Sequence, residues 1–468
     1  MAKKVNIKKG EIKYKESDDY SSKRLTNFMI KRIRMKMKVA LHNLGCKVNA
    51  YELEAMQQML EQAGYEIVPF APGADIYIIN TCTVTNIADR KSRQMLHKAK
   101  KMNPDAIVVA AGCYVQAKKD EIQIDEAIDI VLGNNKKQDL LTVLRQYDRE
   151  KGQDKELIDL KRPVEYENLQ LSSTGEHTRA YLKVQDGCNQ FCSYCIIPYV
   201  RGRVRSRRRP EIVDEVKRLV ENGYQEFVLT GIHLSSYGVD CEDSLLQLIL
   251  AVHEIEGVKR IRLGSLEPRI ITEEFVKTIS SLSKICPHFH LSLQSGCDAT
   301  LKRMNRRYTA QEYLDGCALL RKYFEHPALT TDVIVGFPQE SEEEFEASRA
   351  MIESVDFYET HIFKYSRREG TRADQMEGQI PEQVKVARSH ILIDLGRQQK
   401  QKFMEYYLGR NVEILFEEQA EIHGKTYWIG HTREYLKVAA DTKENLENCI
   451  KIGKIGGFVE DGVFICAI

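Results

Sequence analysis

Three cysteines on one short stretch have the spacing that points most directly to chemistry. Cys188, Cys192 and Cys195 lie within Gly187-Cys-Asn-Gln-Phe-Cys-Ser-Tyr-Cys. Three thiolates on one tight loop can bind three irons of a [4Fe–4S] cluster, which leaves the fourth iron open to an exogenous ligand. A zinc site usually takes four ligands in paired short spacings, and no second local pair follows. The spacing therefore favours a cluster over zinc or over three structural cysteines.

A second set of cysteines is spread along the chain but repeats one local pattern. Cys46, Cys82 and Cys113 each end a predicted strand. If these strands are parallel, all three thiols emerge at the same carboxyl edge, where open α/β sheets place their ligand sites. The pattern predicts a second three-thiolate site; the alternative is ordinary burial, because cysteine is a common small core residue. Six other cysteines lack ligand-like spacing and are interpreted as free thiols or packing residues: Cys241, Cys286, Cys297, Cys317, Cys449 and Cys466.

The elements that must position this second set alternate between strand and helix over residues 37–148. Strand-length apolar runs lie at residues 39–43, 76–80 and 106–111, and helical patterns lie between them at 49–63 and 89–102. Strands that alternate with helices predict a parallel sheet covered on both faces. The first domain is therefore expected to be an α/β domain that carries the second cysteine set.

A second alternating region, residues 176–405, must position the Cys188–Cys195 loop. Its six predicted strands favour a partial or full α/β barrel. They are residues 180–184, 227–229, 260–263, 289–293, 329–335 and 360–365. The polar residues 149–175 between the two regions are expected to form a linker. Residues 406–468 contain short strands with Gly-rich turns, which predict a small β-barrel.

The composition supports a chain of several packed domains. Of 468 residues, 43% are hydrophobic and 29% are charged, which excludes global disorder and, at roughly 150 residues per domain, suggests about three domains. No run approaches the roughly 18 apolar residues of a membrane span, and no secretory signal follows Met1. Twelve cysteines in an unsecreted chain indicate metal ligands or free thiols rather than disulfides. We therefore expect a cytoplasmic protein without a membrane partner.

Residues 1–36 form a basic segment with 12 Lys and Arg against 4 Asp and Glu, in a chain whose net charge is only +1. No sustained apolar period runs through the segment, so we expect a flexible extension. Met35 and Met37 stand just before the first predicted strand. The extension is interpreted as a mis-assigned translation start or a disordered tail, and the alternative is a basic arm that contacts RNA.

The Cys188–Cys195 loop after a first barrel strand resembles the loop of the radical S-adenosylmethionine superfamily. The resemblance implies that the open iron binds the amino and carboxylate groups of S-adenosylmethionine, and that an electron from the cluster cleaves it to methionine and a 5′-deoxyadenosyl radical. It also places the cosubstrate contacts at the ends of successive strands, although each could be an ordinary turn residue. These predicted contacts are Thr230, Gly231, Ser265, Glu267, Gln294 and Asp332.

Both cysteine sets and the C-terminal β domain together resemble the methylthiotransferase family over nearly everything from residue 38 to the end. Matching segments are Asn43–Asn49, Asn80–Asn86, Cys188–Tyr199 and Leu291–Gly296. The resemblance implies two [4Fe–4S] clusters, one on each cysteine set, and the cluster on Cys46, Cys82 and Cys113 would hold or supply sulfur. It also implies that the C-terminal barrel is a TRAM domain, a small RNA-binding module.

Within that family, the motifs closely resemble the bacterial branch that methylthiolates N6-threonylcarbamoyladenosine at position 37 of tRNA. The resemblance implies that the radical abstracts hydrogen from C2 of the adenine and that a methylthio group is inserted there. It also implies two S-adenosylmethionine molecules per turnover, the tRNA anticodon loop as partner, and an electron donor such as flavodoxin or ferredoxin. The alternative substrates are isopentenyladenosine 37 of tRNA and a ribosomal-protein aspartate. Outside the family, the alternative is a non-catalytic iron or zinc RNA-binding protein.

Basic and aromatic side chains supply candidate RNA contacts. Six arginines in nine residues follow the cysteine loop, and their planar guanidinium groups suit phosphate, so RNA contact is favoured over a solvated face. They are Arg201, Arg203, Arg205, Arg207, Arg208 and Arg209. Basic residues of the 89–102 helix are instead expected to form a solvated face. Tyr427 and Trp428 either stack on bases or belong to the barrel core.

Two smaller groups of polar side chains lie near the predicted barrel strand ends. Arg367, Arg368 and Arg372 are candidates for pairing with the carboxylate of a threonylcarbamoyl group, or are surface residues. His233 and His361 are interpreted as ordinary histidines, with substrate contact as the alternative. The sulfur donor, the identity of the electron donor and the oligomeric state do not follow from the sequence.

Overall fold

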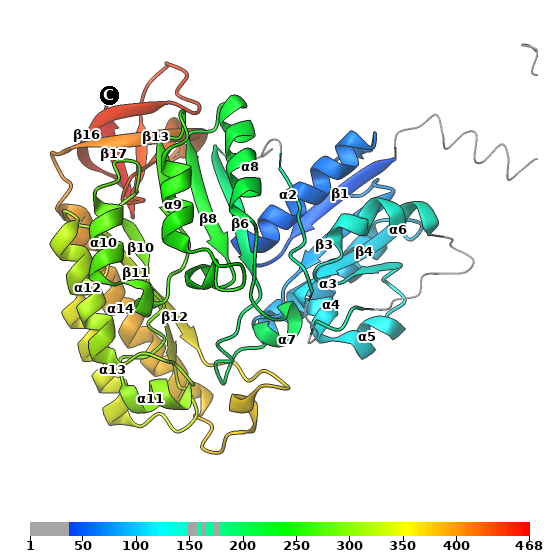
Figure 1. Ribbon diagram of the computed structural model, residues 1–468, viewed down its shortest axis with the longest axis horizontal. Coiled ribbons are helices and arrows are strands. Elements are labelled where there is room, and N and C mark those ends of the chain that lie inside the picture. Colours follow the sequence, from blue (N-terminus) through cyan, green and yellow to red (C-terminus); the bar gives the residue numbers. More distant parts are fainter. Residues whose placement is uncertain (1–36, 148–156, 161–163, 172–177) are drawn as a thin grey trace, which may run out of the picture.

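The computed structural model describes residues 37–147, 157–160, 164–171 and 178–468. The predicted basic extension (1–36) and most of the predicted linker lie outside the described residues. Figure 1 shows an α/β domain beside a larger central domain, which carries a small barrel at one end. We refer to these parts as the N-terminal domain, the central domain and the C-terminal barrel.

The N-terminal domain is a parallel sheet with helices on both faces, as the alternating pattern predicts. Its strands are β1 (Lys38–Asn43), β2 (Glu66–Ile67), β3 (Ile76–Thr81), β4 (Ile107–Gly112) and β5 (Ile130–Leu132), in the order β2-β1-β3-β4-β5. One face packs against α2 (Lys47–Gln62) and α6 (Leu140–Gln146), and the other packs against α3 (Asn86–Met102), α4 (Cys113–Ala117) and α5 (Lys119–Ile124). Because both faces are covered, β3 and β4 are buried along their whole length.

The central domain is an arc of parallel strands, which confirms the predicted partial barrel. The arc runs through β6 (Arg179–Asp186), β8 (Glu226–Gly231), β9 (Arg260–Leu263), β10 (His288–His290), β11 (Ala328–Val335) and β12 (Glu359–Lys364). Parallel bridges from Ile261 to Ile285 and from Leu266 to Leu291 join its two halves. A short strand that the sequence did not predict, β7 (Arg205–Ser206), pairs antiparallel with the end of β6.

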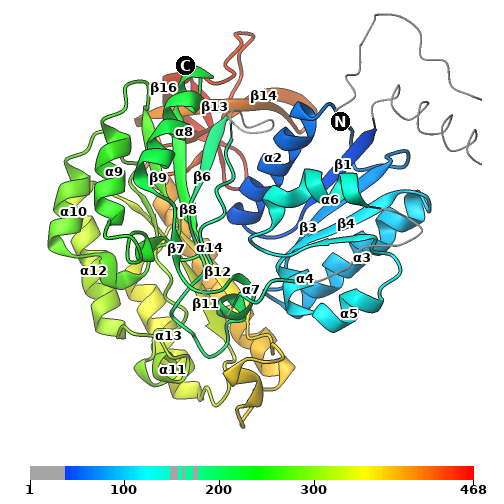
Figure 2. The same ribbon diagram turned by 45° about the vertical axis from the view of Figure 1, so that its right-hand side comes forward.

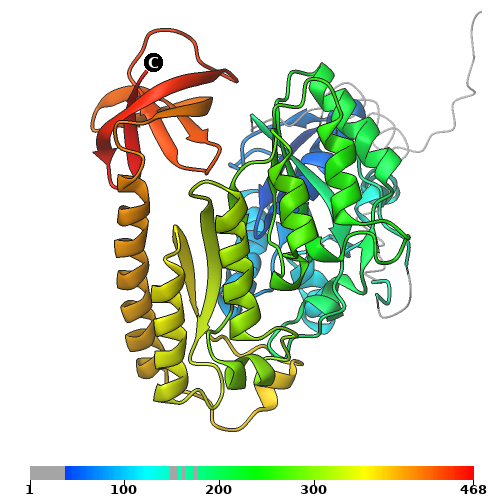
Figure 3. The same ribbon diagram turned by 60° about the vertical axis from the view of Figure 1, so that its left-hand side comes forward.

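Helices cover the outer side of this arc and pack with its outward-facing apolar residues into one core. They are α8 (Arg209–Glu221), α9 (Leu245–His253), α10 (Glu273–Ser280), α12 (Ala310–Tyr323), α13 (Glu342–Val355) and α14 (Glu382–Glu405). Two shorter helices lie at the carboxyl ends of the strands: α7 (Ile197–Arg201) and α11 (Asp298–Arg303). Figure 3 shows α14 running along the domain and leading into the C-terminal barrel.

The C-terminal barrel is closed in the order β13-β14-β15-β17-β16, which confirms the predicted small β-barrel. Its strands are β13 (Asn411–Ile422), β14 (Lys425–Thr432), β15 (Lys437–Ala440), β16 (Ile450–Glu460) and β17 (Val463–Ala467). Trp428 packs with Phe416 and Phe464 in its core, so the core interpretation of Trp428 is confirmed, whereas Tyr427 is half-buried.

The C-terminal barrel docks at the amino ends of the central strands. Arg260, at the start of β9, lies 2.9 Å from a carboxylate oxygen of Glu413 on β13, and Arg433 donates to the carbonyl of Ile285 just before β10. The Cys188–Cys195 loop follows the opposite, carboxyl end of β6. None of the described helices is long and apolar enough to cross a membrane.

Candidate active site

The Cys188–Cys195 loop is a tight turn fixed by backbone hydrogen bonds, both within the loop and to segments later in the chain. The Cys188 N–H donates to Gly202 O at 3.0 Å, and the Cys195 N–H donates to Cys192 O at 3.0 Å. Gly187 has φ +70°, and a Cβ there would lie 1.9 Å from Arg203 O, so only glycine fits this entry to the loop. The three thiols thus lie on one short segment, which is also anchored from outside, since the Ser193 N–H donates to Met304 O at 3.0 Å.

These three thiols open into a pocket of about 140 Å³ at the carboxyl ends of the central strands. The pocket is lined by Cys188, Gln190, Cys192, Tyr194, Cys195, Ile197, Ile232, His233, Ser265, Leu266, Glu267, Ser292 and Arg306. Arg306 donates from Nη1 to Cys192 Sγ at 3.2 Å, which places a cation against one thiol. Burial, together with the Arg306 cation, lowers the pKa of His233 to about 4, so this histidine is neutral at physiological pH.

Two of the predicted cosubstrate contacts, Ser265 and Glu267, line this pocket. Thr230 and Gly231 end β8 just before the lining residue Ile232, and Gly231 is packed against the Gln185 side chain, where a Cβ would lie 2.8 Å from Oε1. Gln294, at φ +66°, lies deeper in the barrel wall, where its N–H donates to Asp332 O at 2.8 Å. Asp332 does not line the pocket; its carboxylate lies 3.3 Å from His290 Nε2.

The donor set fits three irons of a [4Fe–4S] cluster. Cys188, Cys192 and Cys195 are free thiols that interact electrostatically with one another, and all three line the same pocket. Burial raises the pKa of Cys188 to about 11 and that of Cys195 to about 12. Without metal these thiols are protonated, so cluster binding must release their protons.

The second cysteine set converges at the carboxyl edge of the N-terminal sheet, as its placement predicts. Cys46 is the last residue before α2, Cys82 follows β3, and Cys113 follows β4. A Cβ on Gly45, which has φ +111°, would lie 3.1 Å from Cys82 Sγ. Burial, with smaller contributions from the neighbouring Cys113 and Cys46 thiols, raises the pKa of Cys82 to about 11. The three thiols thus lie at one sheet edge and interact electrostatically with one another.

Arg201, at the end of α7, connects the two thiol sites. Its Nε donates to Cys113 Sγ at 3.2 Å, and its Nη2 donates to Asn49 Oδ1 at 2.6 Å. Its Nη1 lies 2.9 Å from Glu52 of α2 and 3.1 Å from Asp186, the last residue of β6. The side chain is completely buried. Figure 2 shows α7 lying against α4, the helix that begins with Cys113.

Comparison with known proteins decides the family. The Uncharacterized protein family UPF0004 matches residues 38–133, and the Radical SAM superfamily (radical S-adenosylmethionine) matches residues 182–352. The Threonylcarbamoyladenosine tRNA methylthiotransferase MtaB of Bacillus subtilis (strain 168) is 41% identical over 433 residues, which cover 91% of this chain and 96% of that protein. The chain belongs to the radical SAM methylthiotransferase family.

Other methylthiotransferases are similar over most of the chain. MtaB of Aquifex aeolicus (strain VF5) is 40% identical and covers 84% of this chain and 95% of its own. The tRNA-2-methylthio-N(6)-dimethylallyladenosine synthase of Moorella thermoacetica is 37% identical and covers 80% and 85%. The radical S-adenosylmethionine methyltransferase TsrM of Kitasatospora setae matches in structure with a TM-score of 0.55 at 17% identity, covering 73% of this chain and 77% of that one, which supports the radical SAM fold.

The arginine run of this methylthiotransferase is not a uniform RNA-binding strip. Arg201, Arg205 and Arg207 are buried, so the prediction that they contact RNA is wrong. Arg207 pairs with Glu215 and Arg205 with Asp186, because this segment pairs with β6 and faces the N-terminal domain. The remaining members Arg203 and Arg208 are exposed and Arg209 is half-buried. The basic residues of α3 are mostly exposed, as expected for a solvated face.

Arg368 also lies in the interface between the N-terminal domain and the central domain. Its Nη1 lies 2.8 Å from an Asp89 carboxylate oxygen, and its Nη2 donates to Thr83 Oγ1 at 2.8 Å. The side chain is 5% exposed, so the prediction that it receives a substrate carboxylate is wrong. Arg367 pairs with Asp374 at 3.0 Å, and Arg372 is exposed.

A polar cluster inside the barrel was not predicted from the sequence. His290, Asp332 and His361, from the adjacent strands β10, β11 and β12, place one ligand atom each within 4.8 Å of one another. His290 is two residues before Ser292, which lines the cysteine pocket, so the cluster lies roughly 7 Å further along the same strand face. The sequence marks Asp332 and His361 separately as residues near strand ends, but only the pairing of β10 to β12 brings them beside His290.

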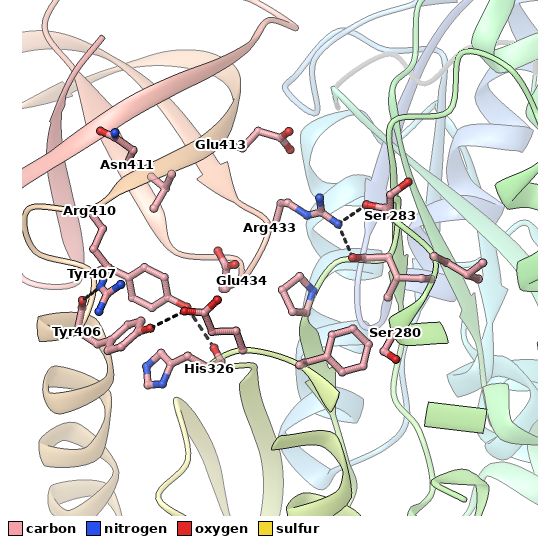
Figure 4. Close-up of a pocket in the computed structure, with 16 residues that line it drawn as sticks. Ser280, Ser283, His326, Tyr406, Tyr407, Arg410, Asn411, Glu413, Arg433 and Glu434 are labelled. Atoms are coloured by element: carbon pink, nitrogen blue, oxygen red, sulfur yellow. Dashed lines mark hydrogen bonds between the residues drawn. The ribbon is translucent and has the colours of Figure 1, made fainter. Parts of the chain in front are cut away.

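A second pocket, of about 500 Å³, lies between the C-terminal barrel and the amino ends of the central strands (Figure 4). Arg433 there is held by the carbonyls of Ser283 and Ile285, and Arg410 lies over the Tyr406 ring. Three glutamates, Glu325, Glu413 and Glu434, also line it. It lies at the opposite strand ends from the cysteines, and its two arginines face three carboxylates, so it fits neither the radical chemistry nor a phosphate.

Proposed function

We propose that this protein methylthiolates C2 of N6-threonylcarbamoyladenosine at position 37 of tRNA, giving 2-methylthio-N6-threonylcarbamoyladenosine. The proposal is carried by the 41% identity to MtaB of Bacillus subtilis over 91% of this chain. The hydrogen at C2 is neither acidic nor labile enough for ordinary general-base chemistry, which explains the need for a radical. The C2 hydrogen is removed and a methylthio group takes its place.

The pocket around Cys188, Cys192 and Cys195 is the proposed radical centre. A [4Fe–4S] cluster bound there supplies, at its open iron, the site and the electron for cleavage of S-adenosylmethionine to methionine and a 5′-deoxyadenosyl radical. Arg306 holds Cys192 and presents its cationic side chain to the pocket. We assign the cosubstrate to the strand ends beside the thiols, through Thr230, Gly231, Ser265, Glu267, Gln294 and Asp332. Ser265 and Glu267 have the strongest support, since both line the pocket.

The N-terminal domain is the proposed sulfur site. Cys46, Cys82 and Cys113 would bind a second [4Fe–4S] cluster, whose role is to hold or supply the sulfur. Support comes from the three thiols at one sheet edge and from Lys47, next to Cys46, whose ammonium lies 5.9 Å from the ring of Tyr181 on β6. That contact supports the proposal, because it brings the residue after Cys46 against β6, the strand that leads to the Cys188–Cys195 loop. In this proposal residues 37–148 supply the sulfur and residues 176–405 generate the radical. Residues 406–468 bind RNA as a TRAM domain.

The proposed tRNA contact lies on the outer side of the radical loop. The Arg203 guanidinium lies 4.5 Å from the centroid of the Phe191 ring, and Phe191 meets Tyr199 edge to face at 5.8 Å. Arg203 is exposed and Tyr199 is 41% exposed, so this group offers a cation and an aromatic face to unpaired bases of the anticodon loop. An electron donor such as flavodoxin or ferredoxin would reduce the enzyme, and the reaction is assigned to the cytoplasm.

The experiment offers purified enzyme two tRNAs that differ only in the group at N6 of adenosine 37. One carries threonylcarbamoyl and the other isopentenyl, and nucleosides are measured by mass spectrometry. We expect the 2-methylthio product from the threonylcarbamoyl tRNA alone. Product from the isopentenyl tRNA alone would overturn the proposed substrate. It would favour the second candidate, isopentenyladenosine, which is also called dimethylallyladenosine. The 37% identity to the Moorella thermoacetica enzyme motivates this candidate. A Cys188→Ala variant, which should give neither product, is the control.

A further inference from the structure

The arginine that joins the two cysteine sites lies in a buried network of charges. Glu52 accepts from Arg201 at 2.9 Å, from Lys183 at 2.7 Å and from Lys137 at 3.1 Å. Asp186 lies 3.1 Å from Arg201 and 2.7 Å from Lys183. All five side chains are at most 2% exposed. Although burial alone would raise it, the three cations hold the pKa of Glu52 well below its usual range, so this carboxylate is ionised.

The buried charges of this network do not balance. Its cations are Arg201, Lys137, Lys183 and Arg205, and its carboxylates are Glu52, Asp186 and Glu167. Among these described side chains the cations exceed the carboxylates by one, and an uncompensated buried charge is costly. An anionic three-thiolate cluster at Cys113 would supply the missing negative charge. The network therefore suits a cluster-bound state of the second cysteine set better than a set of neutral thiols.

Arg201 contacts one thiol of this set and the strand that leads to the other set. Its Nε donates to Cys113 Sγ, while the Asp186 carboxylate that it holds also accepts from the Gly187 N–H at 2.7 Å, directly before Cys188. Asn134 adds a neutral donor to Cys113 Sγ at 3.6 Å and fixes α7 through the carbonyl of Val200 at 2.7 Å. A cation that donates to a cluster sulfur stabilises the more negative, reduced state of that cluster.

We propose that Arg201 is a positioning residue that sets the reduction potential of the cluster on Cys46, Cys82 and Cys113 and ties that site to the radical loop. This rests on the proposed second cluster. Arginine is required because one planar fork must reach Cys113, Asn49 and Asp186 at once. Lysine presents a single point charge and cannot make all three contacts.

The test uses full-length protein in which Cys188, Cys192 and Cys195 are changed to Ala, so that it carries the second cluster alone. After anaerobic reconstitution, iron content is measured, and the midpoint potential is determined by a redox titration followed by electron paramagnetic resonance. Arg201→Gln should retain about four irons and lower the midpoint. At the parent midpoint, the ratio of reduced to oxidised cluster should fall about tenfold, a shift of about 59 mV for one electron.

A second variant should shift the midpoint potential in the opposite direction. Glu52→Gln removes a negative charge from the same network and leaves Arg201 in place, so its midpoint should rise above that of the parent. The matched control is Arg207→Gln, which removes an equally buried arginine of the same run that contacts Glu215 and no cysteine. Its reduced-to-oxidised ratio should stay within about twofold of the parent, because Arg207, unlike Arg201, donates to no cysteine of the proposed cluster site.

The outcomes separate the two claims. A parent protein that binds no iron contradicts the second cluster itself, and the role of Arg201 falls with it. A parent with about four irons whose midpoint is unchanged in Arg201→Gln contradicts the role of Arg201 alone. If Arg201→Gln does not retain iron, the Glu52→Gln variant tests the proposal instead. A midpoint potential of Glu52→Gln that equals that of the parent, or lies below it, contradicts the electrostatic coupling between this network and the cluster. Equal shifts in Arg201→Gln and Arg207→Gln would show a structural effect and would also overturn the proposal.

Discussion

The two cysteine sites of this methylthiotransferase are built in opposite ways. The proposed radical site takes all three of its thiols from one loop of eight residues, Cys188–Cys195. The proposed sulfur site takes one thiol from each of three strand ends, so the parallel sheet must fold before the thiols meet. A loop can bind metal through local geometry, whereas the second site depends on the whole domain.

The two sites also differ in where their cation comes from. Cys192 receives the guanidinium of Arg306, which lies in the same domain. Cys113 receives that of Arg201, which lies in the other domain. The sulfur site is therefore complete only when the two domains are docked. The comparison teaches that the interface between the two domains supplies a side chain, Arg201, that contacts a thiol of the proposed sulfur site.

The largest effect is expected from removing the local site. Changing Cys188, Cys192 and Cys195 to Ala should abolish both 5′-deoxyadenosine formation and methylthiolation, because the cosubstrate loses its iron. Iron after anaerobic reconstitution should fall from about eight to about four atoms per chain, since each cluster carries four. Iron analysis and chromatography of the nucleosides check this. A wild-type chain that never exceeds about four irons would contradict the claim that the chain binds two clusters.

A smaller effect, on tRNA binding, is expected from changing the exposed Arg203 or its neighbour Tyr199. Arg203→Gln or Tyr199→Ala should weaken tRNA binding roughly fivefold, about 1 kcal/mol, as expected when one base-stacking contact is lost. Cleavage of S-adenosylmethionine without tRNA should not change, because neither side chain lines the cysteine pocket. Filter binding at fixed salt measures the affinity. Arg208→Gln, another exposed arginine of the run, is the matched control, and an equal loss there would remove the assignment of the Arg203 group.

The smallest effect is expected from residues 1–36. All six cysteines of the two sites lie after this segment in the chain, and β1 begins at Lys38, so a chain that starts at Met37 should keep its fold and its activity within about twofold. The measurement is methylthiolation rate beside tRNA affinity at physiological salt. Loss of tRNA binding in the shortened chain, with iron content unchanged, would instead favour the basic-arm alternative.

Much of the fold follows from the sequence because it is local. The apolar runs predict β1, β3 and β4, and their ends predict where Cys46, Cys82 and Cys113 converge, since parallel strands share an edge. The roles of Arg201 and Arg368 could not be predicted in this way. Arg201 meets Glu52, 149 positions away, and Arg368 meets Asp89, 279 positions away. Charge composition alone cannot distinguish an arginine that faces RNA from one that neutralises a buried carboxylate.

The most direct test of the account is a chain in which Cys46, Cys82 and Cys113 are changed to Ala. Its radical loop is intact, so it should still bind about four irons and still produce 5′-deoxyadenosine from S-adenosylmethionine under reducing conditions. It should give no methylthiolated nucleoside from threonylcarbamoyl tRNA, because the sulfur site is gone. Methylthiolation that persists in this variant, or loss of 5′-deoxyadenosine while about four irons remain bound, would contradict the division of labour between the two cysteine sites.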